Sequence, residues 1–156
     1  EGVKSKSGDV LIPGSTTTKG IDLARASRLS FDNVLLGGDI NIIRPDSSKI
    51  NSIFLSYYIS NIAKDEISRR SKGVTIYHIH GNDLKDLDLF IPSSIEEQGV
   101  IAEILNQMDS ELETLELKLT KLKMIKQGMM QELLTGHIRL ATDSENMITT
   151  DSERVF

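Results

Sequence analysis

The densest group of cationic side chains in this sequence is Arg69-Arg70-Ser71-Lys72-Gly73. A planar guanidinium can pair with two acceptors at once, such as phosphate oxygens or a guanine edge, so arginines here suit contact with nucleic acid. Thr75 and Tyr77 follow closely and are candidates for contacts with base edges or sugars. The alternative is structural, because cations at the end of a helix also stabilise its dipole.

A second polar segment, Gly14-Ser15-Thr16-Thr17-Thr18-Lys19-Gly20, contains residue types of a phosphate-binding loop. It does not fit that motif, because a P-loop has glycine before its lysine and serine or threonine after it. Two interpretations remain: a flexible polar loop, or a loop that contacts DNA phosphates. Arg25 and Arg28 would extend the same face. The candidate DNA-binding residues are therefore Thr16, Thr17, Thr18, Lys19, Arg25, Arg28, Arg69, Arg70, Lys72, Thr75 and Tyr77.

No combination of residues predicts an active site. His78 and His80 would face the same side of a strand, but spacing places no third metal ligand, so ordinary polar contacts are the better interpretation. Pro45-Asp46 and Glu116-Leu117-Lys118 contain the pieces of a nuclease motif, but the second piece lies inside a helical repeat and is interpreted as coincidence. No nucleophile has a base at motif spacing, and the motifs of amino-methyltransferases are missing. We therefore expect no catalytic activity, no metal ion and no cofactor.

The strongest periodic pattern is a run of apolar residues whose spacing alternates between four and three. This alternation is typical of a coiled-coil seam, and only Lys126 interrupts it. The seam residues are Ile101, Leu105, Met108, Leu112, Leu115, Leu119, Leu122, Met129 and Leu133. The pattern predicts pairing with a second helix, and packing against the protein's own globular part is the alternative.

The composition limits the class of protein. The chain has 156 residues, of which 38% are hydrophobic and 4% aromatic. This suits one domain plus an extension, with a core of Ile, Leu and Val. There is no run of about 18 apolar residues and no signal-peptide pattern, so we expect no membrane contact. The lack of cysteine fits a reducing, cytoplasmic location.

The net charge of −5 is distributed unevenly along the chain. Residues 1–95 contain twelve Lys and Arg against eleven Asp and Glu, residues 96–140 contain five against eight, and residues 141–156 contain one against four. The acidity therefore lies in the C-terminal part, and the first part is free to present a local basic face.

The first 92 residues have the pattern of a small mixed α/β domain. Short apolar or β-branched runs predict strands at residues 10–12, 34–36, 40–43, 74–79 and 87–91. The second and third runs would form either a hairpin or two separate short strands. Apolar residues at helical spacing predict one helix from a cap at Asn51 or Ser52 to about Arg69. Asn82-Asp83-Leu84 is predicted as a turn or a single helical turn.

A long helix is predicted to follow. Ser93 and Ser94 each have a glutamate three residues later, which is the spacing of a capping box, and Gly136 suits a C-terminal cap after Leu134. At 1.5 Å per residue the helix would be roughly 60 Å long. The predicted fold class is α+β, with a domain at residues 1–92, a coiled-coil helix at 93–136 and a flexible tail at 137–156.

The junction between these parts has a recognisable order of residues. Leu87-Asp88-Leu89-Phe90-Ile91-Pro92 is followed by Glu96-Glu97-Gln98 and Ile101-Ala102, and Leu133-Leu134-Thr135-Gly136 ends the predicted helix. Gly8-Asp9-Val10-Leu11-Ile12 is a glycine–aspartate pair before an apolar strand. Together with the segments 39–45 and 54–59, this order over residues 8–140 resembles the specificity subunit of Type I restriction–modification systems.

The resemblance implies a non-catalytic subunit whose target recognition domain reads one half of a bipartite DNA sequence. In that family long helices separate two such domains and dock methyltransferase subunits, and through them restriction subunits. The expected partners are double-stranded DNA, those subunits, and a partner helix from a second copy or a missing N-terminal half. Recognition domains usually have more sequence before the Gly8-Asp9 pair, so we expect a fragment or a half-subunit. The alternative function is an oligomerisation or adaptor protein with an α/β head that binds no DNA.

Overall fold

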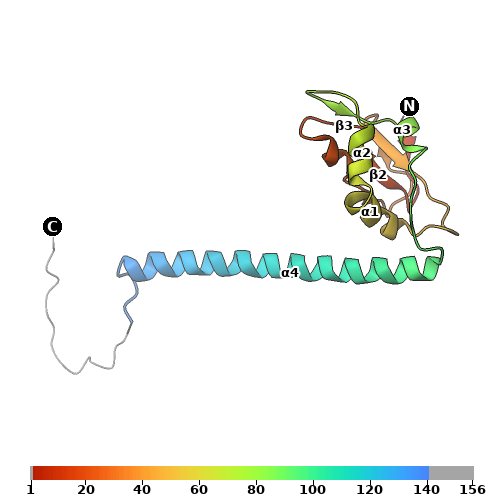
Figure 1. Ribbon diagram of the computed structural model, residues 1–156. Coiled ribbons are helices and arrows are strands. Elements are labelled where there is room, and N and C mark those ends of the chain that lie inside the picture. Colours follow the sequence, from red (N-terminus) through yellow and green to blue (C-terminus); the bar gives the residue numbers. More distant parts are fainter. Residues whose placement is uncertain (1, 141–156) are drawn as a thin grey trace, which may run out of the picture. The chain divides into compact units, whose positions relative to one another are not determined.

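The computed structural model describes residues 2–140. The chain divides into two compact units between Met108 and Asp109, inside one continuous helix. Within the described residues, all strands and short helices belong to the first unit (Figure 1). The predicted domain boundary after residue 92 stays a prediction. Most of the predicted tail, residues 141–156, lies outside the described residues.

The main sheet of the first unit is antiparallel and has the order β4-β2-β6. Its strands are β2 (Val10–Pro13), β4 (Ser27–Arg28) and β6 (Ile40–Ile43). Val10 and Ile12 are buried whereas the residues between and after them are half-buried, because alternate side chains of a strand point to opposite faces. The predicted buried strand at residues 10–12 is confirmed.

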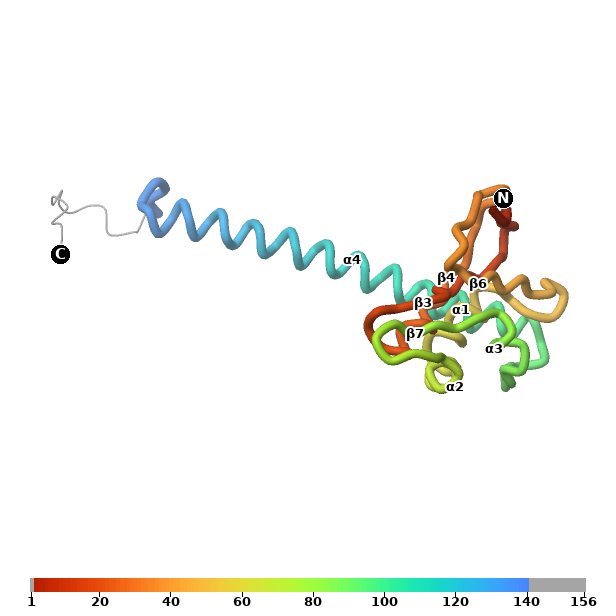
Figure 2. The backbone as a smooth tube through the Cα atoms, turned by 90° about the horizontal axis from the view of Figure 1, so that it is seen from above, coloured from red at the N-terminus to blue at the C-terminus, as the bar shows by residue number. Residues whose placement is uncertain are grey.

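Two further antiparallel pairs flank this sheet. Strand β1 (Val3–Lys4) pairs with β5 (Leu35–Leu36), and β3 (Ser15–Thr16) pairs with β7 (Tyr77–His78). Because β5 pairs with β1 and β6 pairs with β2, the predicted segments 34–36 and 40–43 form two separate short strands and not a hairpin. Figure 2 shows β3 and β7 side by side at one end of the first unit.

The helices that cover the main sheet are α1 (Ser52–Asn61), α2 (Lys64–Arg70) and the short 3-10 helix η1 (Gly20–Ala24). The predicted cap at Asn51 is confirmed, because its side-chain oxygen accepts hydrogen bonds from the amides of Ile53 and Phe54 at 2.9 and 3.0 Å. The prediction of a single helix to Arg69 is wrong. The amides of Ile62 and Ala63 both donate to the Tyr58 carbonyl, which interrupts the helical hydrogen-bond pattern.

The strand predicted at residues 74–79 is wrong in extent. Gly73 has a φ of +130°, and the chain turns through residues 73–76 before it pairs as β7. The strand predicted at 87–91 is absent from this fully described segment. Leu87 and Leu89 pack against the core. The alternation of apolar and polar residues in this segment therefore comes from burial of one side of an irregular segment, and no strand among the described residues pairs with it. The predicted helical turn near residue 83 is confirmed as α3 (Gly81–Leu84).

The hydrophobic core lies between the main sheet and these helices. Its buried members are Val10, Ile12, Leu23, Ala24, Leu55, Ile59, Ala63, Ile67 and Ile79. They come from both the sheet and the helices. Ile59, Ala63 and Ile67 are all buried at a spacing of four residues, although the helix is broken between α1 and α2. Both helices therefore contribute apolar side chains to one core.

The predicted long helix is confirmed as α4 (Ile95–Leu134), with 40 residues. At its start the Ser94 hydroxyl accepts a hydrogen bond from the amide of Glu97 at 3.3 Å. Beyond its end Gly136 has a φ of +75°, a left-handed conformation that glycine adopts easily. The predicted α+β class with one long C-terminal helix is confirmed. None of the helices in the described residues combines the length and apolar character needed to cross a membrane.

Candidate nucleic-acid interface

Several candidate residues meet at the β3–β7 pair. The register places Thr16 opposite Tyr77 and Ser15 opposite His78. Lys72 also bridges His78, and their backbone groups exchange hydrogen bonds of 2.9 and 2.8 Å. We call β3, β7 and the loop of residues 72–76 the ribbon. Its formation brings Thr16 into one structure with Lys72, Thr75 and Tyr77, which lie more than fifty residues later in the sequence.

The threonine-rich segment lies beside the ribbon. Thr16 and Thr18 share a hydrogen bond of 2.9 Å between their hydroxyls, and the Thr18 hydroxyl donates to Asp22. This bond, with the nearby Arg25 guanidinium, holds the pKa of Asp22 below its ordinary value. Thr17 and Lys19 are exposed. Within residues 2–140 Lys19 forms no ion pair, so its ammonium group is available to a phosphate.

The two arginines at the end of α2 differ in their surroundings. Both pair with Glu66 and hold its pKa below the ordinary value, Arg70 more strongly than Arg69. The Arg70 guanidinium also donates to the carbonyls of Asp83 and Asp86, at 3.1 and 2.7 Å. The Arg70 side chain is 26% exposed and that of Arg69 is 74% exposed. Arg70 therefore fastens the α3 region to α2, and Arg69 faces solvent.

The remaining candidate cations each have a different partner. Arg25 is exposed and pairs with Asp22 at 3.3 Å. Lys72 is exposed and pairs with Asp83 at 3.0 Å, which lowers the pKa of that carboxyl. Arg28 donates from Nε to the Ser52 hydroxyl at 3.1 Å, so it is held at the start of α1 and not on the ribbon.

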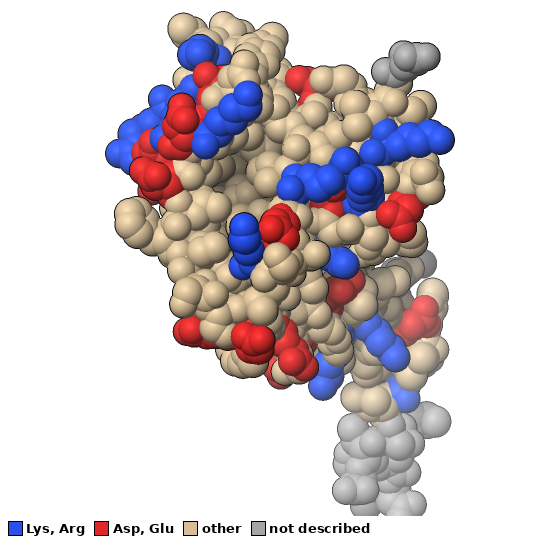
Figure 3. Space-filling model, turned by 90° about the vertical axis from the view of Figure 1, so that its right-hand side faces the viewer, with Lys and Arg blue, Asp and Glu red and all other residues tan. Residues whose placement is uncertain are grey.

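Positive and negative side chains are mixed on the surface of the first unit. On the face seen in Figure 3, Lys and Arg side chains are interspersed with Asp and Glu. This pattern matches the many ion pairs described above, and it means that no broad basic patch dominates this face. Contact with DNA would therefore depend on particular side chains more than on a general positive field.

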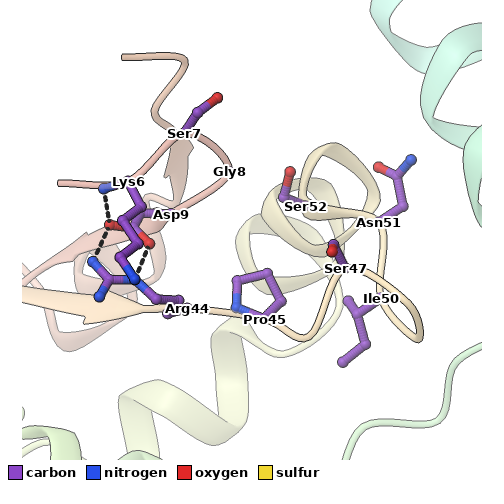
Figure 4. A pocket seen from close by; sticks show the side chains of 10 residues that line it. All are labelled: Lys6, Ser7, Gly8, Asp9, Arg44, Pro45, Ser47, Ile50, Asn51 and Ser52. Carbon is purple, nitrogen blue, oxygen red and sulfur yellow. Dashed lines mark hydrogen bonds and ion pairs between the residues drawn. The ribbon is translucent and has the colours of Figure 1, made fainter. Parts of the chain in front are cut away.

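A pocket of about 300 Å³ lies between the segment before β2 and the start of α1 (Figure 4). At its edge Asp9, which is only 1% exposed, receives two hydrogen bonds of 2.7 Å from Nε and Nη2 of Arg44. The amide of Lys6 donates a third, of 2.8 Å. These bonds, first of all those from Arg44, hold the pKa of Asp9 below its ordinary value.

Sequence reasoning missed the Asp9–Arg44 pair as a structural feature. Both residues lie in segments that carry the family resemblance, one beginning at Gly8 and the other covering residues 39–45. Gly8 has a φ of +92°, which explains a glycine directly before the buried aspartate. The resemblance therefore included both residues, but the sequence could not show that Asp9 pairs with Arg44, because they are 35 residues apart.

Gln98 belongs to the junction segment that carries the family resemblance, but sequence reasoning gave it no role of its own. It lies in the first turns of α4 and is completely buried. Its amide group donates to the carbonyls of Lys49 and Pro92, at 3.1 and 2.8 Å, and its oxygen accepts from the amide of Asn51 at 2.9 Å. Gln98 thereby joins the start of α4 to the start of α1.

The seam of α4 is largely exposed. Exposed fractions are 51% to 58% for Met108, Leu112, Leu115, Leu119, Leu122 and Met129. Ile101, Leu105 and Leu133 are half-buried. Leu122, Met129 and Leu133 also line an apolar hollow near the end of the helix, together with Ile125 and Met130. An apolar stripe of this length, left open to water, is what a partner helix would cover.

Within the described residues no group of three His, Asp or Glu side chains is close enough together to hold a metal ion. His78 lies in β7 and His80 precedes α3.

Comparison with known proteins agrees with these features. The family model for the Type I restriction modification DNA specificity domain matches residues 1–124. A protein of Methanocaldococcus jannaschii, named as the MjaX type I restriction enzyme specificity subunit, is 30% identical to the chain over 104 residues. That alignment covers 65% of this chain and 24% of the relative. The matched part therefore corresponds to about a quarter of the relative's length.

Proposed function

The chain belongs to the family of Type I restriction modification DNA specificity domains, and on this basis we propose that it reads one half of a bipartite DNA target. The family is the non-catalytic DNA-recognition component of these systems. The family membership that the sequence motifs predicted is thus confirmed. The DNA target and the assembly remain part of the proposal.

The observation that carries the proposal is the ribbon beside the threonine-rich segment. The ribbon carries the exposed Thr75 and Lys72, which pairs with Asp83, and the adjoining segment carries the exposed Thr17, Thr18 and Lys19. The DNA major groove is wide enough to admit a two-stranded ribbon, and hydroxyl and cationic side chains are suited to its phosphates and base edges. We propose direct DNA contacts for Thr16, Thr17, Thr18, Lys19, Arg69, Lys72, Thr75 and Tyr77.

The other candidate residues have different proposed roles. Arg70 fixes the backbone near α3 through the carbonyls of Asp83 and Asp86, so we propose a structural role for it. Arg28 holds the start of α1 through Ser52. Arg25 is exposed and pairs with Asp22, as Lys72 pairs with Asp83, and we propose a phosphate contact for it as well. Binding to DNA also agrees with a cytoplasmic location. That location was predicted from composition and stays a prediction.

Helix α4 is proposed to pair with a partner helix and to dock methyltransferase subunits, and through them restriction subunits. Its exposed seam supports this role. The partner helix comes from a second copy or from another part of a longer subunit. The charge along α4 changes sign: the seven charged residues before Lys118 are all acidic, whereas the part from Lys118 to the end contains four lysines and one acidic residue, Glu132. Between two copies, only an antiparallel arrangement brings the acidic half of each helix against the basic half of the other.

A selection experiment tests the proposed function. The full chain, combined with methyltransferase subunits of the same system, is mixed with a pool of random DNA duplexes, and bound duplexes are sequenced. We expect enrichment of one short sequence that the methyltransferase subunits alone do not enrich. A complex that assembles but enriches no sequence would instead support the adaptor function.

A further inference from the structure

Val74, at the tip of the ribbon, is unusually exposed for an apolar residue. It is 90% exposed, the highest value among the large hydrophobic residues of the described part. Ile76, two residues later, is 44% exposed. Neither packs in the core, so folding of the first unit gains almost nothing from Val74. A valine that is 90% exposed, between Gly73 and Thr75, is therefore free to contact a partner.

The loop that carries Val74 has a defined shape. The paired backbone hydrogen bonds between Lys72 and His78 close it at its base. Gly73 adopts a φ of +130°, and a Cβ atom placed on it would lie 1.8 Å from the carbonyl oxygen of Ile76. Only glycine fits there, so the backbone folds tightly back on itself and presents Val74 at a fixed position.

The surroundings of Val74 are polar and cationic. The Lys72 side chain is 77% exposed on one side, and the exposed Thr75 follows on the other. Two apolar side chains are too few for a stable protein interface, which typically buries about 800 Å² on each partner. A short apolar tip bordered by a lysine and a threonine is better suited to a DNA groove.

The major groove contains one apolar group, the C5 methyl of thymine. We propose that Val74 contacts a thymine methyl in the major groove and so determines specificity for a T·A pair at one position of the half-site. This proposal rests on the proposed DNA-recognition function and assigns one element of its readout. Lys72 and Lys19 would hold the ribbon at the groove through the phosphates.

Replacement of thymine by uracil tests the contact, because uracil lacks only the methyl group. The probe is the duplex that the full chain with its methyltransferase subunits enriches from the random pool, with each thymine replaced in turn by uracil. We expect about fourfold weaker binding at one position, which is the loss of roughly one buried methyl group. Val74→Ser should bind thymine and uracil duplexes equally at that position.

Val3→Ser is the matched control, because Val3 is also an exposed valine, at 57%, but lies in β1. It should keep the thymine preference. Gly73→Ala should lose the preference, because it displaces the tip. A wild-type chain that binds uracil and thymine duplexes equally at every position, or a Val74→Ser variant that keeps the preference, would overturn the proposal. A wild-type chain that enriches no sequence would overturn the proposed function as well, which separates the two failures.

Discussion

The side-chain oxygen of Gln98 accepts a hydrogen bond of 2.9 Å from the backbone amide of Asn51, the residue that caps α1. The same glutamine donates to the carbonyls of Lys49 and Pro92. One buried side chain therefore satisfies three backbone groups from two segments. It fixes the first turns of α4 to the recognition domain.

Replacement of Gln98 should be costly. We expect Gln98→Leu to lower the free energy of unfolding by about 2–4 kcal/mol, because it leaves three backbone groups without their partner. Denaturant unfolding followed by circular dichroism measures this change. Gln107→Leu is the control, since Gln107 is an exposed glutamine of the same helix, and it should change stability by less than about 0.5 kcal/mol. Equal effects of the two variants would show that Gln98 has no such role.

The Asp9–Arg44 pair should make stability depend on pH. The pKa of Asp9 in the folded protein lies below its ordinary value of 3.8. Its contribution is therefore fully present above about pH 4 to 5 and is lost as pH falls through the lower, folded-state pKa. Asp9→Asn should cost about 2 kcal/mol at pH 7 and progressively less in acid. Melting temperatures from pH 2 to 7 test this.

Asp88→Asn provides the comparison for that series, because Asp88 is exposed. Its melting curves should follow those of the wild-type protein at each pH. A constant difference between Asp9→Asn and wild type over the whole range would contradict the role of the Asp9 charge.

Substitutions of the two arginines of α2 should have different effects on stability and on DNA binding. Arg70→Ala is expected to lower the free energy of unfolding by about 1–2 kcal/mol, because two carbonyls lose their side-chain donor and Glu66 keeps only Arg69. Arg69→Ala should leave stability nearly unchanged, because an exposed ion pair contributes little, and should weaken DNA binding. Thermal unfolding and fluorescence-anisotropy titration distinguish the two. The interpretation fails if Arg69→Ala is the more destabilising variant.

Lys19 should contact a phosphate and so affect the salt dependence of DNA binding. Each phosphate contact contributes about 0.9 to the slope of log affinity against log salt concentration. We expect Lys19→Ala to reduce the slope by about that amount, with similar losses for specific and random duplexes. Titrations at several salt concentrations measure it. Lys118→Ala, on the exposed surface of α4, should leave the slope unchanged, and an equal reduction there would point to a general charge effect.

The seam should be sensitive to charge. Leu115→Asp combined with Leu122→Asp would place charged carboxylates in an apolar contact, so we expect helix pairing to be lost. Sedimentation velocity of the full chain measures the assembly state. Leu117→Asp is the matched control, since Leu117 lies on α4 outside the seam and is 67% exposed. If the seam variant sediments like wild type, the seam contacts another part of the same chain.

The sequence alone determined the elements whose pattern is local and long. The alternating spacing of α4, its start after Ser94 and its end before Gly136 all follow from hydrogen bonds and apolar contacts within a few residues. The cap at Asn51 and the buried strand at β2 are predictable for the same reason. The family resemblance also lay in short linear segments, which is why it was detectable without coordinates.

Only the tertiary structure decided which distant residues meet. The pairing of β3 with β7, the division of α1 from α2 and the different surroundings of Arg69 and Arg70 depend on contacts across many residues. Leu87 and Leu89 alternate like a strand, but a strand needs a neighbour, and none lies beside them among the described residues. Spacing along the chain describes one side chain relative to the next, whereas burial and pairing are properties of the packed whole.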